Sequence, residues 1–124
     1  MREKVIDTRV RDVIAEVANK VAGLPDSHPE EEQLHLANQL RSSAAVISMG
    51  LDIIKTDVSQ QKQELAHTIE RIENLLLEVV NNLKIALIRG YINNNDYYEA
   101  CILIERLHGE LTTLRDDCLA ENVL

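Results

Sequence analysis

The stretch "QLHLANQLRSSAAVISMGLDIIK", residues 33–55, predicts the fold of this chain through the spacing of its apolar residues. They recur at alternating intervals of three and four positions, which places them on one side of an α-helix. A seam of this kind is buried against other helices. It consists of Ala37, Leu40, Ala44, Ile47, Leu51 and Ile54. We interpret the stretch as one long helix of a helical bundle.

Three further segments on either side of this stretch carry the same periodicity. The first is stopped by Gly23 and Pro25. Asp57 and Gln60 have the spacing of a capping box, which predicts the break between the second and third helices. The predicted helices span residues 3–22, 31–55, 58–89 and 96–119. Because short connections make sequential helices antiparallel, the sequence predicts an all-α, up-down-up-down four-helix bundle.

The composition bounds the size of the protein and its partners. A chain of 124 residues predicts a single domain, residues 1–124, and its core must be aliphatic because Phe and Trp are absent and Tyr occurs three times. The net charge of -8 opposes nonspecific attraction to nucleic acid and to anionic membranes. The N-terminus shows no signal-peptide pattern, and no apolar run is long enough to span a bilayer. We therefore expect a cytoplasmic protein without membrane contact.

The stretch "IRGYINNNDYYEA", residues 88–100, holds all three tyrosines and raises the question of a ligand site. Its asparagines and aspartate lack the spaced ligands, central glycine and final glutamate of a calcium-binding EF-hand loop. A helix-to-helix turn accounts for the residues better. Gly90 suits the left-handed end of one helix, with Tyr91 or Ile92 as its hydrophobic contact. Asp96 and Glu99 match the capping box of the next helix, and Tyr97 joins its seam.

The second predicted helix carries too little charge for an exposed helix. Between Gln33 and Leu51 the only formally charged residue is Arg41. A surface helix normally has a charged outer face, so we expect this helix to be covered on more than one side and the protein to be a homo-oligomer. The alternative is a neutral Ser/Gln face exposed to water. The predicted subunit interface comprises Leu36, Arg41, Ser43, Val46 and Gly50.

Candidate metal ligands occur as two Glu-x-x-His motifs, "ELAH" at residues 64–67 and "ERLH" at residues 105–108. Di-iron bundles use such motifs, together with one glutamate from each remaining helix. The antiparallel register separates the two motifs by about 15 Å along the bundle, and the second helix has no carboxylate before Asp52. Neither cysteine lies in a C-x-x-C pair, and no catalytic motif is present. The sequence predicts no metal, no cofactor and no catalytic residue.

The segment "NQLRSSAAV", residues 38–46, also resembles the second-helix motif of histidine phosphotransfer domains. Asn38 stands where those domains carry the phosphorylated histidine, and Ser42 stands at the glycine position. An amide cannot accept a phosphoryl group. This alternative would make the protein a degenerate phosphotransfer-like module.

The order of "GLP", "LANQLRSSAAVI" and "ALIRGYINNNDYYEACILIERL" along the chain resembles a known family. Its members are four-helix bundles encoded in intervening sequences of bacterial 23S ribosomal RNA genes, related to the accessory variability proteins of diversity-generating retroelements. The resemblance implies a non-catalytic bundle that assembles into a closed ring, commonly a pentamer. In the retroelement branch it also implies binding to a reverse transcriptase and to RNA through a basic surface. Against that second role, Arg41 is followed by Ser42 where the family has paired arginines.

Overall fold

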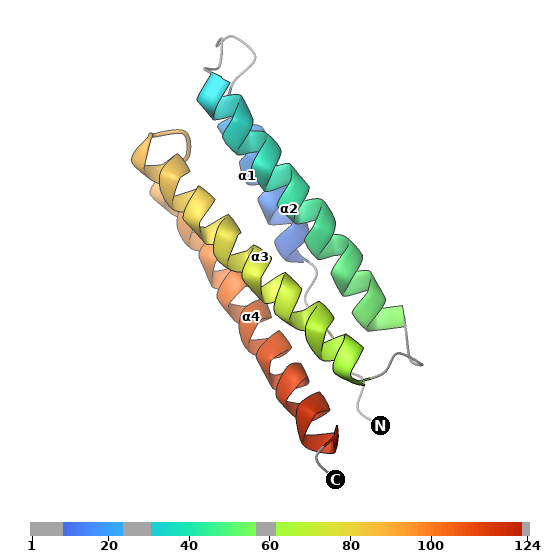
Figure 1. The fold of residues 1–124 in the computed structure, drawn as a ribbon. Coiled ribbons are helices and arrows are strands. Elements are labelled where there is room, and N and C mark those ends of the chain that lie inside the picture. Colours follow the sequence, from blue (N-terminus) through green and yellow to red (C-terminus); the bar gives the residue numbers. More distant parts are fainter. Residues whose placement is uncertain (1–8, 24–30, 57–61, 123–124) are drawn as a thin grey trace.

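The computed structural model describes residues 9–23, 31–56 and 62–122, and these form four helices without a strand. The helices are α1 (Arg9–Val21), α2 (Glu31–Thr56), α3 (Lys62–Ile88) and α4 (Asn94–Asn122). Consecutive helices run in opposite directions (Figure 1). Each helix packs against the next, and α1 also packs against α4. The predicted up-down-up-down four-helix bundle is confirmed.

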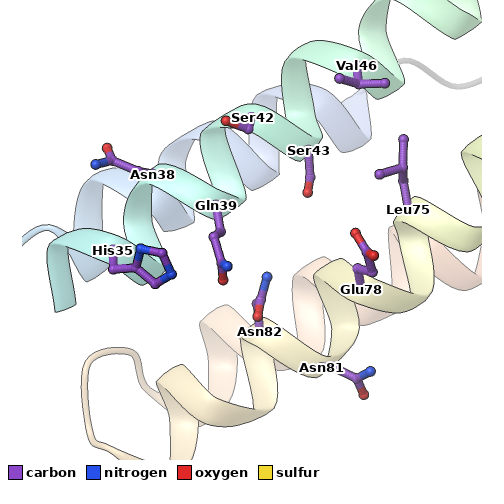
Figure 2. A pocket seen from close by; sticks show the side chains of 10 residues that line it. All are labelled: His35, Asn38, Gln39, Ser42, Ser43, Val46, Leu75, Glu78, Asn81 and Asn82. Atoms are coloured by element: carbon purple, nitrogen blue, oxygen red, sulfur yellow. The ribbon is translucent and has the colours of Figure 1, made fainter. Parts of the chain in front are cut away.

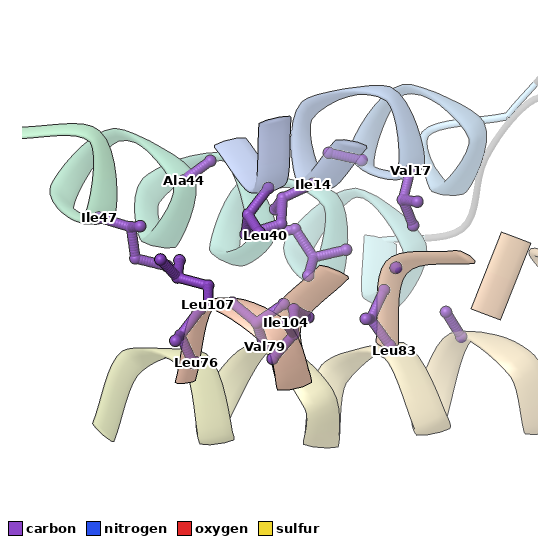
Figure 3. Packing of buried hydrophobic residues seen from close by; sticks show 14 of the residues in the cluster. Ile14, Val17, Leu40, Ala44, Ile47, Leu76, Val79, Leu83, Ile104 and Leu107 are labelled. Carbon is purple, nitrogen blue, oxygen red and sulfur yellow. The ribbon is translucent and has the colours of Figure 1, made fainter. Parts of the chain in front are cut away.

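The core is aliphatic and receives side chains from all four helices, as Figure 3 shows around Leu40, Leu76 and Leu107. Burial of each large aliphatic side chain contributes about 1.5–3 kcal/mol to folding. The predicted seams supply most of these side chains, because positions three and four apart lie on the same side of a helix. The largest fully buried ones are Ile14, Leu40, Ile47, Leu51, Ile69, Ile72, Leu76, Leu83, Leu107 and Leu111.

The helix ends agree with the predicted ends to within a few residues where they are described. α1 ends before Gly23, which has a φ of 97°. α2 extends one residue past the predicted end, to Thr56, and α3 ends one residue early, at Ile88. The predicted start of the first helix, residues 3–8, and the predicted cap at residues 57–60 lie outside the described residues.

α4 begins two residues earlier than predicted, because its cap is Asn93 and not Asp96. The Asp96 N–H donates to Oδ1 of Asn93 at 2.8 Å, and the Asn93 N–H donates to Oδ2 of Asp96 at 3.3 Å. This reciprocal pair is a capping box displaced by three residues toward the N-terminus. Asp96 is therefore a residue of the first turn, where its negative charge lies near the positive end of the helix dipole.

The α2–α3 pair packs closely around a glycine. A Cβ atom built on Gly50 would lie 2.7 Å from Cδ1 and 2.8 Å from Cγ1 of Ile72, well inside van der Waals contact. The absence of a side chain at Gly50 thus lets the two helices approach at this level. Two ion pairs join helices at the end of the bundle that holds the α3–α4 turn: Lys20 of α1 with Asp96 of α4, and Arg89, directly after α3, with Glu32 of α2.

Candidate interaction surface

The outer side of α2 exposes a stripe of apolar side chains. Val46, Met49 and Ile53 are 42%, 66% and 41% exposed, and their spacing places them on one side of the helix. Single exposed apolar residues are ordinary, but a contiguous stripe indicates an interaction site. No helix in the described part of the chain has the length and apolar character that a membrane span requires.

A groove of about 680 Å³ lies beside this stripe, between α2 and α3. Figure 2 shows side chains of both helices directed into it. Most carry amide or hydroxyl groups, which both donate and accept hydrogen bonds. The lining residues are His35, Asn38, Gln39, Ser42, Ser43, Val46, Leu75, Glu78, Asn81 and Asn82. We call the stripe of Val46, Met49 and Ile53, together with this groove, the α2–α3 surface.

Three of the five residues of the predicted subunit interface are buried within the subunit itself. Leu36 is part of the hydrophobic core. Ser43 is 8% exposed at the wall of the groove, and Gly50 contacts Ile72 of α3. The low charge of α2 is thus explained in part by its own bundle.

The other two predicted interface residues, Arg41 and Val46, reach the surface. Nη2 of Arg41 donates to Oδ1 of Asn19 in α1 at 3.0 Å, and Nη1 donates to Oδ1 of Asn38 at 3.3 Å. The guanidinium therefore lies on the α1 side of α2, away from α3. Glu78 is the one Asp, Glu, Lys or Arg among the residues that line the groove.

The predicted turn residues all lie at the corner between α3 and α4. Gly90 has a φ of 77°, its N–H donates to the Leu87 carbonyl, and the Tyr91 N–H donates to the Ala86 carbonyl. These bonds form a Schellman motif with Gly90 as its left-handed residue. Tyr91 is half-buried against the core, as the motif requires of its hydrophobic contact.

The remaining turn residues belong to the first turns of α4. Asp96 pairs with Lys20, and this hydrogen bond raises the pKa of the lysine. Tyr97 packs against the core, and its ring meets that of Tyr98 edge-on with centroids 6.1 Å apart. Glu99 is exposed. Ligand chemistry is therefore not gathered in this corner; its side chains hold the two helices and α1 together.

A polar cluster that the sequence did not reveal lies between α3 and α4. Glu73 is only 6% exposed, and its carboxylate accepts from Nη1 of Arg115 at 2.7 Å and from Oγ1 of Thr112 at 3.0 Å. Nε2 of His108 is 3.2 Å from the same carboxylate. Three partners satisfy a buried carboxylate that would otherwise be costly to fold. The antiparallel register, which sets Glu73 level with Thr112, was the available signal.

The residues considered for metal or thiol chemistry are dispersed. No group of three or more His, Cys, Asp or Glu side chains that could hold a metal ion occurs within residues 9–23, 31–56 and 62–122. His67 lies 3.9 Å from Glu70 at the surface, whereas His108 faces Glu73. Cys101 is not in a disulfide, and its burial raises the pKa of the thiol.

Comparison with protein families, with curated proteins and with solved structures gave no match. The side chains of the α2–α3 surface indicate what that surface can bind. Apolar side chains beside neutral amides and hydroxyls can form noncovalent contacts with another macromolecule.

Proposed function

We propose that this protein is a non-catalytic, homo-oligomeric helical scaffold that associates through the α2–α3 surface. The observation that carries the proposal is the exposure of Val46, Met49 and Ile53 beside a groove of neutral polar residues. Covering the three apolar side chains removes their surface from water, at about 25 cal/mol per Å² of apolar area. This gain favours association through this side of the bundle.

The charge of the chain also favours this side for self-association. Two copies with a net charge of -8 each repel one another at long range. Contact is least costly where little charge is present, because formal charges need not then be removed from water. The amides of Asn38, Gln39, Asn81 and Asn82 can pair with polar groups of a second copy, since each amide both donates and accepts.

The resemblance of the sequence to the ribosomal intervening-sequence family supports a closed ring, with five subunits as the expected number. It also supports a cytoplasmic protein whose role is protein–protein interaction. A ring uses heterologous contacts that close after a fixed rotation.

Light scattering on the purified protein at micromolar concentration tests the proposal. We expect a mass several times that of the 14.0 kDa chain. Met49→Glu should lower the mass, because it places a negative charge in a contact between two acidic chains. Ala15→Glu, at an exposed position on α1, is the matched control and should leave the mass unchanged. A monomeric wild-type protein would refute the proposed function.

Two alternatives are less well supported by the described residues. RNA binding in a reverse-transcriptase accessory role requires cations available to phosphates. The net charge of -8 opposes such binding, and three of the described cations, Lys20, Arg89 and Arg115, are already paired with carboxylates. A phosphotransfer module requires an acceptor at Asn38, which is exposed but carries an amide. Retention on immobilised RNA at physiological salt would favour the first alternative over the scaffold.

A further inference from the structure

A second apolar surface lies on the neighbouring side of the bundle, over α3 and α4. Leu77, Tyr98 and Ile102 are exposed by 58%, 63% and 53%. Leu77 lines a groove of about 380 Å³ together with Leu76, Val80, Ile104, Glu105, His108 and Gly109. Tyr98 and Ile102 precede Glu105 by seven and three positions, which places them on the same side of α4. We call these three residues and this groove the α3–α4 surface. In the bundle α3 lies between α2 and α4 (Figure 1). The two surfaces therefore flank α3 on opposite sides.

The two surfaces carry opposite charges in opposite order along the helix axis. On the α2–α3 surface, Glu78 lines the groove, and Arg71 lies two turns toward the start of α3 on the same side of the helix. On the α3–α4 surface, Lys84 lies one turn beyond Val80, toward the end of α3. Glu105 of α4 borders the same groove at the level of Val80. The charges of Lys84 and Glu105 both affect the pKa of the Cys101 thiol, so both side chains lie near the same stretch of α4.

A single translation along the helix axis brings these features into register. Two contacts fix the height of α2 and α4 residues along α3: Gly50 of α2 lies level with Ile72, and Thr112 of α4 lies level with Glu73. On this scale Glu78 lies six positions below Lys84, and Val46 lies about seven positions below Ile102. At 1.5 Å per residue, the shift that superposes them is about 10 Å.

The same shift also brings a second pair of opposite charges, Arg71 and Glu105, close together. Arg71 lies about nine positions below the level of Glu105, or about 13 Å, and the length of the arginine side chain covers the remaining 3 Å or so. The register therefore pairs Glu78 with Lys84, Arg71 with Glu105, and the apolar residue Val46 with Ile102. Agreement of two charge pairs and one apolar pair is the charge complementarity expected of a specific interface.

We propose that the α2–α3 surface of one copy docks on the α3–α4 surface of the next, with parallel bundles staggered by about 10 Å. This inference rests on the proposed self-association and specifies its partner surface. The contact is heterologous, and it covers both apolar surfaces with one kind of interface. Each copy uses one surface toward each of its two neighbours, so the contact repeats from copy to copy. It closes into a ring when neighbouring bundles cross at an angle, because a stagger between strictly parallel bundles gives an open helix.

The competing arrangement is a two-fold contact of the α2–α3 surface with itself. In that antiparallel arrangement Glu78 meets Arg71 of the second copy, and Leu77, Tyr98 and Ile102 remain in water. The two arrangements therefore predict different partners for Glu78. Neither partner can pair with Glu78 within one chain, because positions six or seven apart on a helix are out of reach.

Charge reversal distinguishes these arrangements when sedimentation velocity is measured at several protein concentrations. Glu78→Lys alone and Lys84→Glu alone should each weaken association by at least about tenfold, because each brings like charges together. The double variant E78K/K84E should recover wild-type association. Rescue of E78K by R71E, with none by K84E, would overturn the heterologous contact and leave the oligomeric scaffold standing. A monomeric wild-type chain would instead refute the proposed function.

A mixing experiment gives a second, independent readout. Met49→Glu blocks the α2–α3 surface, because the register sets residue 49 level with Glu105 of the next copy, and Ile102→Lys blocks the α3–α4 surface by placing a charge opposite Val46. Both positions are exposed, so both variants should keep wild-type helicity by circular dichroism. Each variant alone should be monomeric. An equimolar mixture should form a heterodimer through the two intact surfaces. A mixture that stays monomeric while the wild type is oligomeric would contradict the heterologous contact.

Discussion

A glycine-to-alanine substitution at Gly50 tests the close packing of α2 on α3. Alanine is favoured over glycine inside a helix by about 1 kcal/mol, so the substitution would be stabilising if the site were open. At Gly50 the new Cβ would lie 2.7 Å from Cδ1 and 2.8 Å from Cγ1 of Ile72. Ile72 is 2% exposed, and as a β-branched residue in a helix it has one strongly preferred χ1 rotamer. We expect overpacking to cost about 1–3 kcal/mol and to cancel or exceed the helical gain.

Gly109→Ala is the matched control for this prediction. Gly109 is also in a helix interior, but nothing lies within 4 Å of the position its Cβ would take. This variant should gain the full helical preference of about 1 kcal/mol. The difference between the two variants therefore isolates the packing cost at Ile72. Equal stabilisation by both substitutions would refute the close approach of α2 and α3.

Urea unfolding followed by far-ultraviolet circular dichroism measures both variants against the wild type. The free energy of unfolding follows from linear extrapolation to zero urea, and the slope reports whether the exposed area has changed. Because association stabilises the folded state, all three proteins are compared at the same two protein concentrations. A Gly50→Ala effect that is the same at both concentrations belongs to the subunit, whereas one that grows with concentration belongs to a contact between copies.

Three further predictions concern the turn, the buried carboxylate and the thiol. Gly90→Ala should lower the free energy of unfolding by about 1–2 kcal/mol, because the φ of 77° is unfavourable for an L-residue. No atom lies within 4 Å of the new Cβ, so the cost comes from the backbone alone. Gly90→Asn should cost less, because asparagine tolerates this conformation, and urea unfolding measures both variants. Glu73→Ala should cost about 1–3 kcal/mol in the same assay, since the half-buried Arg115 loses its acceptor but can still reach water. Cys101 should react with iodoacetamide with a pH midpoint above that of a small thiol, because burial raises the pKa of its thiol; a midpoint at or below that of the small thiol would contradict the burial.

The helices were predictable from the sequence, because an amphipathic seam is a local pattern that repeats over many residues. The position of Gly90 was equally readable, since a glycine between two long seams has few other uses. The start of α4 was less determined. Three consecutive asparagines precede Asp96, and each can accept a hydrogen bond at a helix N-terminus, so the choice of Asn93 depends on where the corner packs. Glu73 was missed because its partners come from another helix.

The uncharged second helix shows why a sequence cannot separate contacts within a chain from contacts between chains. Gly50 and Ser43 are small for packing against α3 of the same bundle, and the pattern for a partner helix of another copy would be identical. Because Gly50 and Ser43 belong to the interior of the bundle, the lack of charge needs a further explanation only on the outer side of α2. There Met49 is 66% exposed beside a groove rich in neutral amides. An exposed face under selection for solubility alone would carry lysine and glutamate, so its neutrality favours a surface that is covered by another copy.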